Sequence, residues 1–318
     1  MTCYYIYLYT KEACHSTSGR TAWLTALDKR RTPTVPTDDL VLTMPSLIPS
    51  HARRAGRLSR EARVAILWAS AAAIALAAAL GPPFAQPESY HAFADRRALL
   101  GIPNALDVTS NLVFLVVGLL GLHFVLRGRL SDGSRAFQNA SERWAWAVVF
   151  AATALTCCGS SYYHLAPDSP RLTWDRLPMA IGFVGIVAAA VSERISAKAG
   201  RWLLVPLCLL GAASVWYWRW SAAHGIENLN PYGAVQFGSA LLLLLIIALF
   251  PPRYTRGRDF FGALILYALA KVAEQFDRAI FAGTGGIVSG HTLKHLLAAA
   301  AIFWLLRMLK LRRGMPGS

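Results

Sequence analysis

The sequence predicts an all-α, polytopic membrane protein with eight transmembrane helices. Its 318 residues are 55% hydrophobic and only 15% charged, whereas a soluble domain carries about 25% charged residues. The mean hydropathy of the chain is +0.40. The apolar residues are also gathered into blocks near the length that crosses a bilayer, about 20 residues each. A soluble globular fold is therefore excluded before any site is considered.

Eight apolar segments have roughly the length of a membrane span. In chain order they are residues 64–80, 105–126, 144–164, 175–191, 202–218, 232–250, 260–281 and 291–309. Gly81-Pro82-Pro83 ends the first segment and Pro251-Pro252 ends the sixth, because proline cannot continue a helix. The polar link 86–103 separates the first two spans and could hold a short amphipathic helix.

The first 60 residues predict a disordered leader. They include Pro- and Thr-rich stretches and a basic segment from His51 to Arg63. A secretory signal peptide would begin at the N-terminus with a basic region and end in a cleavage site, which this stretch does not do. Met44 is an alternative start, and translation from it would leave most of the leader out of the protein.

The formal net charge of +15 indicates membrane topology rather than nucleic-acid binding, because the basic residues flank apolar segments. With eight spans, and with the leader counted from Arg53 on, 19 Lys and Arg residues fall on one side of the membrane and six on the other. The basic side holds the leader and the tail, residues 311–318. The positive-inside rule therefore places both termini in the cytoplasm, and a bacterial inner membrane is the expected location. No nucleic-acid partner is expected.

Four ionisable residues are predicted to lie at the same depth, on the non-cytoplasmic side. His164 ends the third span, which runs outward, and Asp175 starts the fourth, which runs inward. His291 and His295 start the eighth span, which also runs inward. Ionisable residues inside a membrane are costly and usually functional. Because the topology was derived without these residues, their agreement in depth favours one common site.

His291 and His295 are four residues apart, so they lie on one helix face, one turn apart. Two such imidazoles can bind one metal, and His164 supplies a third neutral nitrogen. Three histidines with an open position are typical of catalytic zinc, which activates water and polarises carbonyls. Asp175 is the candidate general base, and Ser160, one turn before His164, is the candidate hydrogen-bond donor. The five cysteines show no Cys-x-x-Cys spacing, so a cysteine zinc site is not indicated.

Simpler interpretations apply to the polar residues of the spans. An intramembrane histidine often makes only a hydrogen bond between helices, so a His-x-x-x-His pair alone is a weak indication of metal. His91 lies in the polar link and is expected to be solvated. Lys271, Glu274 and Asp277 are spaced by three, which favours a structural ion-pair ladder, although Asp277 could instead line a cavity. Lys294 is expected to turn away from the face of the two histidines.

These motifs resemble the alkaline ceramidase family, in particular its bacterial branch. The resemblance rests on Ser160-x-x-x-His164, on Asp175 within Asp-Arg-Leu-Pro-Met, on Gly290-His291-Thr-Leu-Lys-His295 and on Ser110-Asn111-Leu112. It covers residues 86–310. The family belongs to a superfamily of seven-helix membrane hydrolases that includes the adiponectin and progestin receptors and the Per1-like proteins of GPI remodelling.

The resemblance implies a seven-helix core bundle around a zinc ion, formed by residues 86–310. Residues 61–85 would then form one extra N-terminal transmembrane helix. The zinc ligands that it implies are His164, His291 and His295. It also implies that Ser160 and Asp175 lie beside the activated water. The family reaction is hydrolysis of the ceramide amide to a sphingoid base and a fatty acid.

The sequence departs from the family at two places. Eukaryotic ceramidases bind calcium through an acidic, Trp-containing cluster before the first core helix. Here only Glu88, Asp95 and Asp107 are nearby, so the residues give little support for Ca²⁺ beside Zn²⁺. In addition, Lys294 stands where the family has a wide aromatic side chain between the last two histidines.

The sequence thus predicts a zinc-dependent intramembrane hydrolase that cleaves the amide of ceramide-like N-acyl lipids reaching it from the bilayer. Two alternatives stay open. A receptor-like protein would use its metal structurally, and another lipid hydrolase of the same superfamily would cut an ester or an N-acyl amino lipid. A transporter is not favoured, because the ionisable groups gather at one end of the spans rather than along a path across the membrane.

Overall fold

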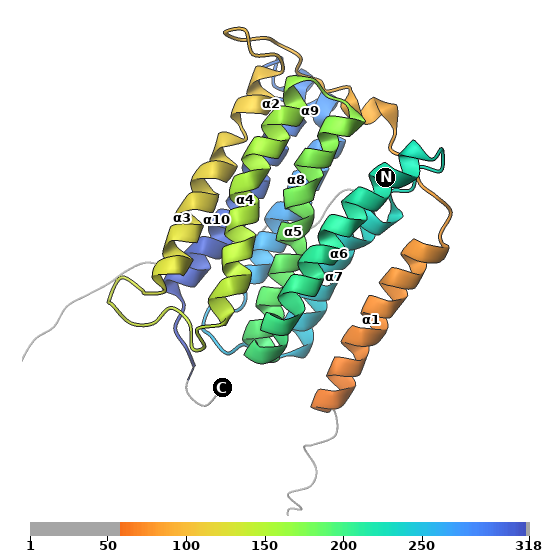
Figure 1. Ribbon diagram of the computed structural model, residues 1–318. Coiled ribbons are helices and arrows are strands. Elements are labelled where there is room, and N and C mark those ends of the chain that lie inside the picture. Colours follow the sequence, from red (N-terminus) through yellow and green to blue (C-terminus); the bar gives the residue numbers. More distant parts are fainter. Residues whose placement is uncertain (1–57, 316–318) are drawn as a thin grey trace, which may run out of the picture. The chain divides into compact units, whose positions relative to one another are not determined.

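The computed structural model describes residues 58–315, and every regular element in this part of the chain is helical (Figure 1). The predicted leader lies almost entirely outside the described residues, as do residues 316–318 of the tail. The elements are α1 (Arg60–Leu80), η1 (Glu88–His91), α2 (Ala105–Thr109), α3 (Leu112–Arg127), α4 (Glu142–Leu165), α5 (Ser169–Arg194), α6 (Ala197–Ala223), α7 (Asn230–Leu249), α8 (Asp259–Gln275), α9 (Asp277–Gly283) and α10 (Gly290–Leu311).

Seven helical segments within residues 58–315 are long and apolar enough to cross a membrane. They are α1, α2 together with α3 (Ala105–Arg127), α4, α5, α6, α7 and α10. The prediction of an all-helical chain with several membrane-length helices is thus confirmed, and such a chain fits a multi-pass membrane protein. Helices α5 and α6 extend beyond the predicted apolar segments at both ends, because their polar end turns are also helical.

The segment 260–281, predicted as one span, is divided into α8 and α9 and is not among the seven. Backbone hydrogen bonds of 2.9 and 3.0 Å continue from α8 through Phe276 into α9, so the segment is bent rather than interrupted. The Asp277 carboxylate explains the bend. It accepts the backbone N–H groups of Ala94 and His291, both at 2.8 Å, and so is held by two other segments.

The second predicted span is broken close to its start, between α2 and α3. At the break, the side-chain amide of Asn111 donates to the carbonyl oxygen of Asp107 at 2.8 Å, and the Ser110 hydroxyl donates to the same oxygen at 3.1 Å. Short polar side chains that bond to nearby backbone compete with regular helix. The polar residues at the start of this span therefore end one helix and begin another.

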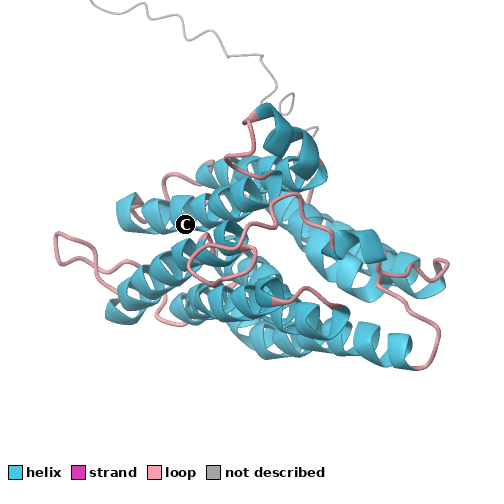
Figure 2. Cartoon of the chain, turned by 90° about the horizontal axis from the view of Figure 1, so that it is seen from above, coloured by secondary structure: helices cyan, strands magenta, loops and turns pink. Residues whose placement is uncertain are grey.

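Helices α4 and α5 lie in the middle of the bundle (Figure 1), and Figure 2 shows the helices of the chain from above. Helix α5 packs against α4, α6 and α7, and α10 packs against α3 and α8. The buried face of α5 includes several small residues, among them Ala180, Ala188, Ala189 and Ala190. Small residues allow close approach between helices in membrane proteins. Because α4 and α5 pack closely, the C-terminal turn of α4 lies beside the N-terminal turn of α5 at one end of the bundle.

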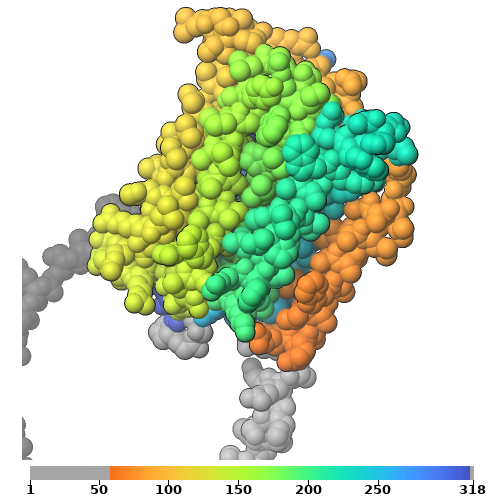
Figure 3. All heavy atoms as spheres, viewed as in Figure 1, coloured from red at the N-terminus to blue at the C-terminus, as the bar shows by residue number. Residues whose placement is uncertain are grey.

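Helix α1 lies at the edge of the bundle, where it contacts α7. Figure 3 shows it as a ridge along the side of the molecule, beside α6 and apart from α4. None of its residues is buried. It approaches α7 closely at Gly238, where an added Cβ atom would lie 2.9 Å from the Ile74 side chain. The core around α4, α5 and α10 is therefore built without α1.

A buried polar cluster closes the end of the bundle where α5 and α10 end. The Arg312 guanidinium forms an ion pair with Glu193, and the Trp146 indole N–H donates to the same carboxylate at 2.8 Å. Arg312 also lies over the Tyr254 ring, 3.9 Å from its centroid. The Tyr254 hydroxyl in turn donates to Glu142 at 2.5 Å. All five side chains are buried, so the cluster joins the end of α10 to α4 and α5.

Arg312→Met should lower the free energy of unfolding by about 3–5 kcal/mol, because it leaves Glu193 as a buried charge without its partner. The matched control is Arg313→Met. Arg313 pairs with Asp132 at the surface, where both side chains are about half exposed, and its loss should cost less than about 1 kcal/mol. Unfolding curves of the purified protein in detergent measure both changes. Equal effects of the two variants would show that the cluster does not stabilise the fold.

Candidate metal centre

His164, His291 and His295 converge between α4 and α10. They form the one group of three or more potential metal ligands found within residues 58–315, and their ligand atoms all lie within 4.8 Å of one another. Each side chain is at most 3% exposed. The Nε2 atoms of His164 and His291 are 3.2 Å apart. The structure thus brings together the three histidines that the sequence predicted to share a site.

Two nitrogens of this triad have the spacing of ligands in a tetrahedral zinc site. With Zn–N bonds of about 2.0–2.1 Å, a tetrahedron separates two ligand nitrogens by about 3.3 Å. The observed distance between the two Nε2 atoms, 3.2 Å, is close to that value. Three imidazoles without a thiolate are also a ligand set that catalytic zinc uses. The triad can therefore hold a metal ion once all three nitrogens, which lie within 4.8 Å of one another, take up this spacing.

Ser110 determines which nitrogen of His295 faces the centre of the triad. The Ser110 Oγ atom lies 2.8 Å from Nδ1 of His295 and donates its own proton to the Asp107 carbonyl oxygen. Ser110 must therefore accept the Nδ1 proton, which leaves Nε2 unprotonated and able to bind metal. This role depends on the break between α2 and α3. Hydrophobic periodicity does not reveal the role of Ser110. The unusually polar start of the second predicted span was the one indication of it in the sequence.

Ser110→Ala should weaken metal binding about 10–100-fold, the usual cost of losing a partner that orients a ligand. A zinc titration against a competing chelator measures the change. Thr109→Ala is the matched control, because Thr109 is an exposed neighbour whose hydroxyl donates only to Ala105 of its own helix, at 2.7 Å. An unchanged affinity in the Ser110 variant would show that another contact orients His295.

The link between α1 and α2 packs over the triad at this end of the bundle. The Phe93 ring contacts His164 and His291, with ring centroids 4.7 and 4.5 Å apart. His91 was expected to be solvated, but it is partly buried and its Nδ1 atom lies 2.8 Å from the Tyr163 hydroxyl. Burial lowers the pKa of His91, which favours the neutral ring. The link therefore folds over the site rather than extending into solvent.

Gly159 allows α4 and α5 to approach closely beside the site. A Cβ atom added to Gly159 would lie 2.0 Å from the carbonyl oxygen of Trp174. That oxygen has no helical N–H partner, because Pro178 stands four residues later within α5. The close contact lies between the residues that precede Ser160 and Asp175, and it brings these two side chains together.

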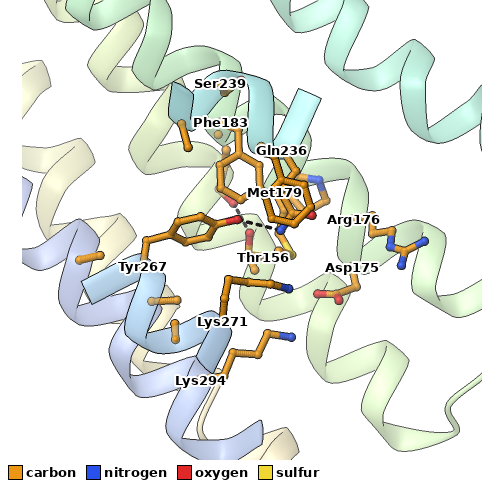
Figure 4. Close-up of a pocket in the computed structure, with 18 of the residues that line it drawn as sticks. Thr156, Asp175, Arg176, Met179, Phe183, Gln236, Ser239, Tyr267, Lys271 and Lys294 are labelled. Carbon is orange, nitrogen blue, oxygen red and sulfur yellow. Dashed lines mark hydrogen bonds between the residues drawn. The ribbon is translucent and has the colours of Figure 1, made fainter. Parts of the chain in front are cut away.

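Ser160 and Asp175 line a cavity of about 410 Å³ together with His295. The Ser160 and Asp175 side chains are both buried. Figure 4 shows the Asp175 carboxylate turned toward the middle of the cavity. Further from the histidines the walls are apolar and include Val149, Ala152, Phe183, Ile186, Leu243 and Leu305. Both predicted catalytic residues thus lie at the polar end of an apolar cavity.

Lys294 lines the same cavity, contrary to the expectation that it turns away from the histidines. Its Nζ atom is 3.5 Å from Nε2 of His291 and 2.7 Å from Oε1 of Glu274. Glu274 also pairs with Lys271 and accepts a hydrogen bond from the Tyr90 hydroxyl at 3.1 Å. Residues three apart on a helix are neighbours, so the spacing of His291 and Lys294 in the sequence indicated that their side chains lie close together. Instead of a ladder along α8 alone, Lys271 and Glu274 of α8 form an ion cluster with Lys294 of α10.

Comparison with known proteins adds no identification to this geometry. No protein-family model, curated protein or solved structure matches the chain. The function must therefore be inferred from the triad and from the cavity beside it.

Proposed function

We propose that this protein is a zinc-dependent hydrolase within the membrane. It cleaves the amide bond of ceramide-like N-acyl lipids and releases a fatty acid and a free amine lipid. The observation that carries the proposal is the buried triad of histidines at the polar end of an apolar cavity that Ser160 and Asp175 also line. The motif resemblance to the alkaline ceramidases supports the choice of an amide as the bond that is cut.

The residues around the triad can divide the chemistry of amide hydrolysis between them. When bound, zinc supplies a Lewis acid that polarises the carbonyl and activates water near neutral pH. The Asp175 carboxylate accepts the proton of the attacking water and passes it to the leaving amine. The Ser160 hydroxyl donates a hydrogen bond to the carbonyl oxygen as negative charge develops there. The apolar walls and the covering Phe93 ring keep bulk water away from these steps.

The cavity also offers a place for the acyl chain. Its volume, about 410 Å³, lies within the range of small-molecule sites, about 300–1,000 Å³. Helices α7 and α8 both line the cavity but have little direct contact with each other. A lipid can therefore reach the cavity sideways from the bilayer, between these two helices, with its amide directed toward the histidines.

The proposal includes a full topology of eight spans. The core has seven, in which α8 and α9 cross the membrane as one bent segment, and α1 is an extra helix before them. The backbone hydrogen bonds that continue through Phe276 support a single bent span. The excess of Lys and Arg, 19 against six, supports cytoplasmic termini. The metal centre then lies toward the non-cytoplasmic side of a bacterial inner membrane.

Metal analysis and a lipid screen on one purified sample test this function. The protein should hold about one zinc ion per chain and release fatty acid from at least one N-acyl lipid, as detected by mass spectrometry. The panel should pair each amide with its ester analogue, because an esterase would reverse the preference. Chelation should abolish turnover and added zinc should restore it. Zinc-loaded protein that releases no product from any amide would contradict the proposal and favour a receptor-like role.

A further inference from the structure

Arg176 is a buried cation in the cavity wall to which the proposed chemistry assigns no role. It follows Asp175 on α5, lines the same cavity and is 5% exposed. Its Nη2 atom donates to the side-chain oxygen of Gln86. Three aromatic rings surround the guanidinium, with centroids 4.4–5.5 Å from its carbon atom, and they belong to Tyr90, Trp218 and Tyr232. In the sequence, Arg176 is one of the six basic residues on the predicted non-cytoplasmic side.

The charge of Arg176 is not balanced by the protein around it. Within residues 58–315 it forms no ion pair with a carboxylate. Its Nη1 atom is buried and has no hydrogen-bond partner among those residues. Aromatic faces attract a cation, but they do not accept hydrogen bonds in the plane of the guanidinium. A buried charged donor left without an acceptor is costly, which indicates that an anion completes the site.

The other charges in the cavity do not supply that anion. Lys271 and Lys294 share the carboxylate of Glu274, and Asp175 forms no ion pair with Arg176. Figure 4 shows both lysine side chains reaching toward Asp175, with Arg176 beyond it. The wall therefore has three cationic side chains against two carboxylates. In a cavity of low dielectric constant, such an excess favours an anionic ligand.

We infer that Arg176 binds a carboxylate on the amine half of the substrate, so that the preferred lipids are N-acyl amino acids rather than neutral amides. This inference rests on the proposed function. With the acyl chain along the apolar walls and the amide nitrogen beside Asp175, the amine substituent lies next to Arg176. A guanidinium binds a carboxylate through two parallel hydrogen bonds, and Nη1 provides an unused donor.

The reaction is then the hydrolysis of one amide bond. Water supplies a hydroxyl group to the acyl carbon and the C–N bond breaks. The nitrogen takes up a proton as it leaves, and at neutral pH the products are a fatty acid carboxylate and a zwitterionic amino acid. The carboxylate at Arg176 does not react. It only places the scissile amide between Asp175 and the histidines.

The test compares two probes that share one acyl chain, N-oleoylglycine and N-oleoylethanolamine, with the zinc-loaded full-length protein in detergent. The wild type should prefer the glycine conjugate in kcat/KM by about tenfold or more, the usual worth of a hydrogen bond to a charged group. Arg176→Gln should lower kcat/KM for N-oleoylglycine about 10–100-fold and change that for the ethanolamide less than about threefold. Arg176→Lys should recover part of the loss. Arg171→Gln, at the partly exposed start of the same helix, should change neither.

A purely structural role would give a different result. Arg176 and Gln86 could simply fasten the link between α1 and α2 to the bundle, and Arg176→Gln would then impair both probes alike. That outcome, or a wild-type preference for the ethanolamide, overturns the inference while leaving amide hydrolysis intact.

A binding measurement covers the case in which neither probe is cleaved and the proposed function fails. N-oleoylglycine should still raise the melting temperature of the zinc-free wild type, but not that of Arg176→Gln. Absence of this Arg176-dependent shift overturns the inference. Oleate is the third probe, because it has the same chain and a carboxylate of its own. An equal, Arg176-dependent shift with oleate would mean that Arg176 holds the acyl product, which also overturns the inference.

Discussion

His291→Ala is expected to remove the bound metal and to lower turnover about 10³-fold or more, which corresponds to about 4 kcal/mol of transition-state stabilisation. The ring of His291 is in contact with both other ligands, with centroids 4.8 Å from those of His164 and His295. Its loss leaves two nitrogens, which are too few for the three-ligand site that catalytic zinc requires. Zinc content and turnover should be measured on the same monodisperse sample, so that both losses are assigned to folded protein.

Histidines outside the triad are the matched controls for this prediction. His123 is exposed on α3, and His224 is exposed at the end of α6, where its Nδ1 atom contacts the Trp220 carbonyl oxygen at 2.8 Å. Alanine at either position should leave zinc and activity unchanged. His291→Gln keeps more of the side-chain volume and serves if the alanine variant does not fold. A folded His291 variant that still holds a full equivalent of zinc would contradict the assignment of the site.

The triad could be predicted because it depends on local spacing and on span direction alone. Residues four apart share a helix face wherever the helix lies, so His291 and His295 were bound to lie together. Span direction then placed His164 at the same end of the bundle. Neither step requires knowledge of how the helices pack. The same holds for the all-helical fold, which follows from the length and composition of the apolar segments.

The rest of the site depends on packing, and there the sequence was a weaker guide. The position of Lys294 beside His291 required the ion pair with Glu274 from α8, a contact between segments. The role of Ser110 required the break between α2 and α3. The uncompensated charge of Arg176 could not be seen without the three rings and Gln86 around it. In each case the decisive contact joins residues that are distant in the sequence. The spacing of residues along the chain cannot predict such a contact.

Asp175→Asn should lower kcat about 10²–10⁴-fold, the usual contribution of a positioned general base, while zinc content stays unchanged. The amide has nearly the same shape as the carboxylate and keeps an oxygen that can accept a hydrogen bond. What it loses is the ability to take a proton from water and return it to the leaving amine. Among the described residues that line the cavity, the other carboxylate is that of Glu274, and it is already paired with two lysines.

Asp168→Asn, the same chemical change on the same helix, is the control for the Asp175 variant. Asp168 caps α5 by accepting the backbone N–H of Arg171 at 2.6 Å, and asparagine caps helices about as well as aspartate does. Its activity and stability should therefore match those of the wild type. Full activity in a zinc-loaded Asp175→Asn protein would rule out proton transfer by Asp175. Loss of zinc together with activity would instead mean that the carboxylate supports the metal site, and the proton would need another carrier.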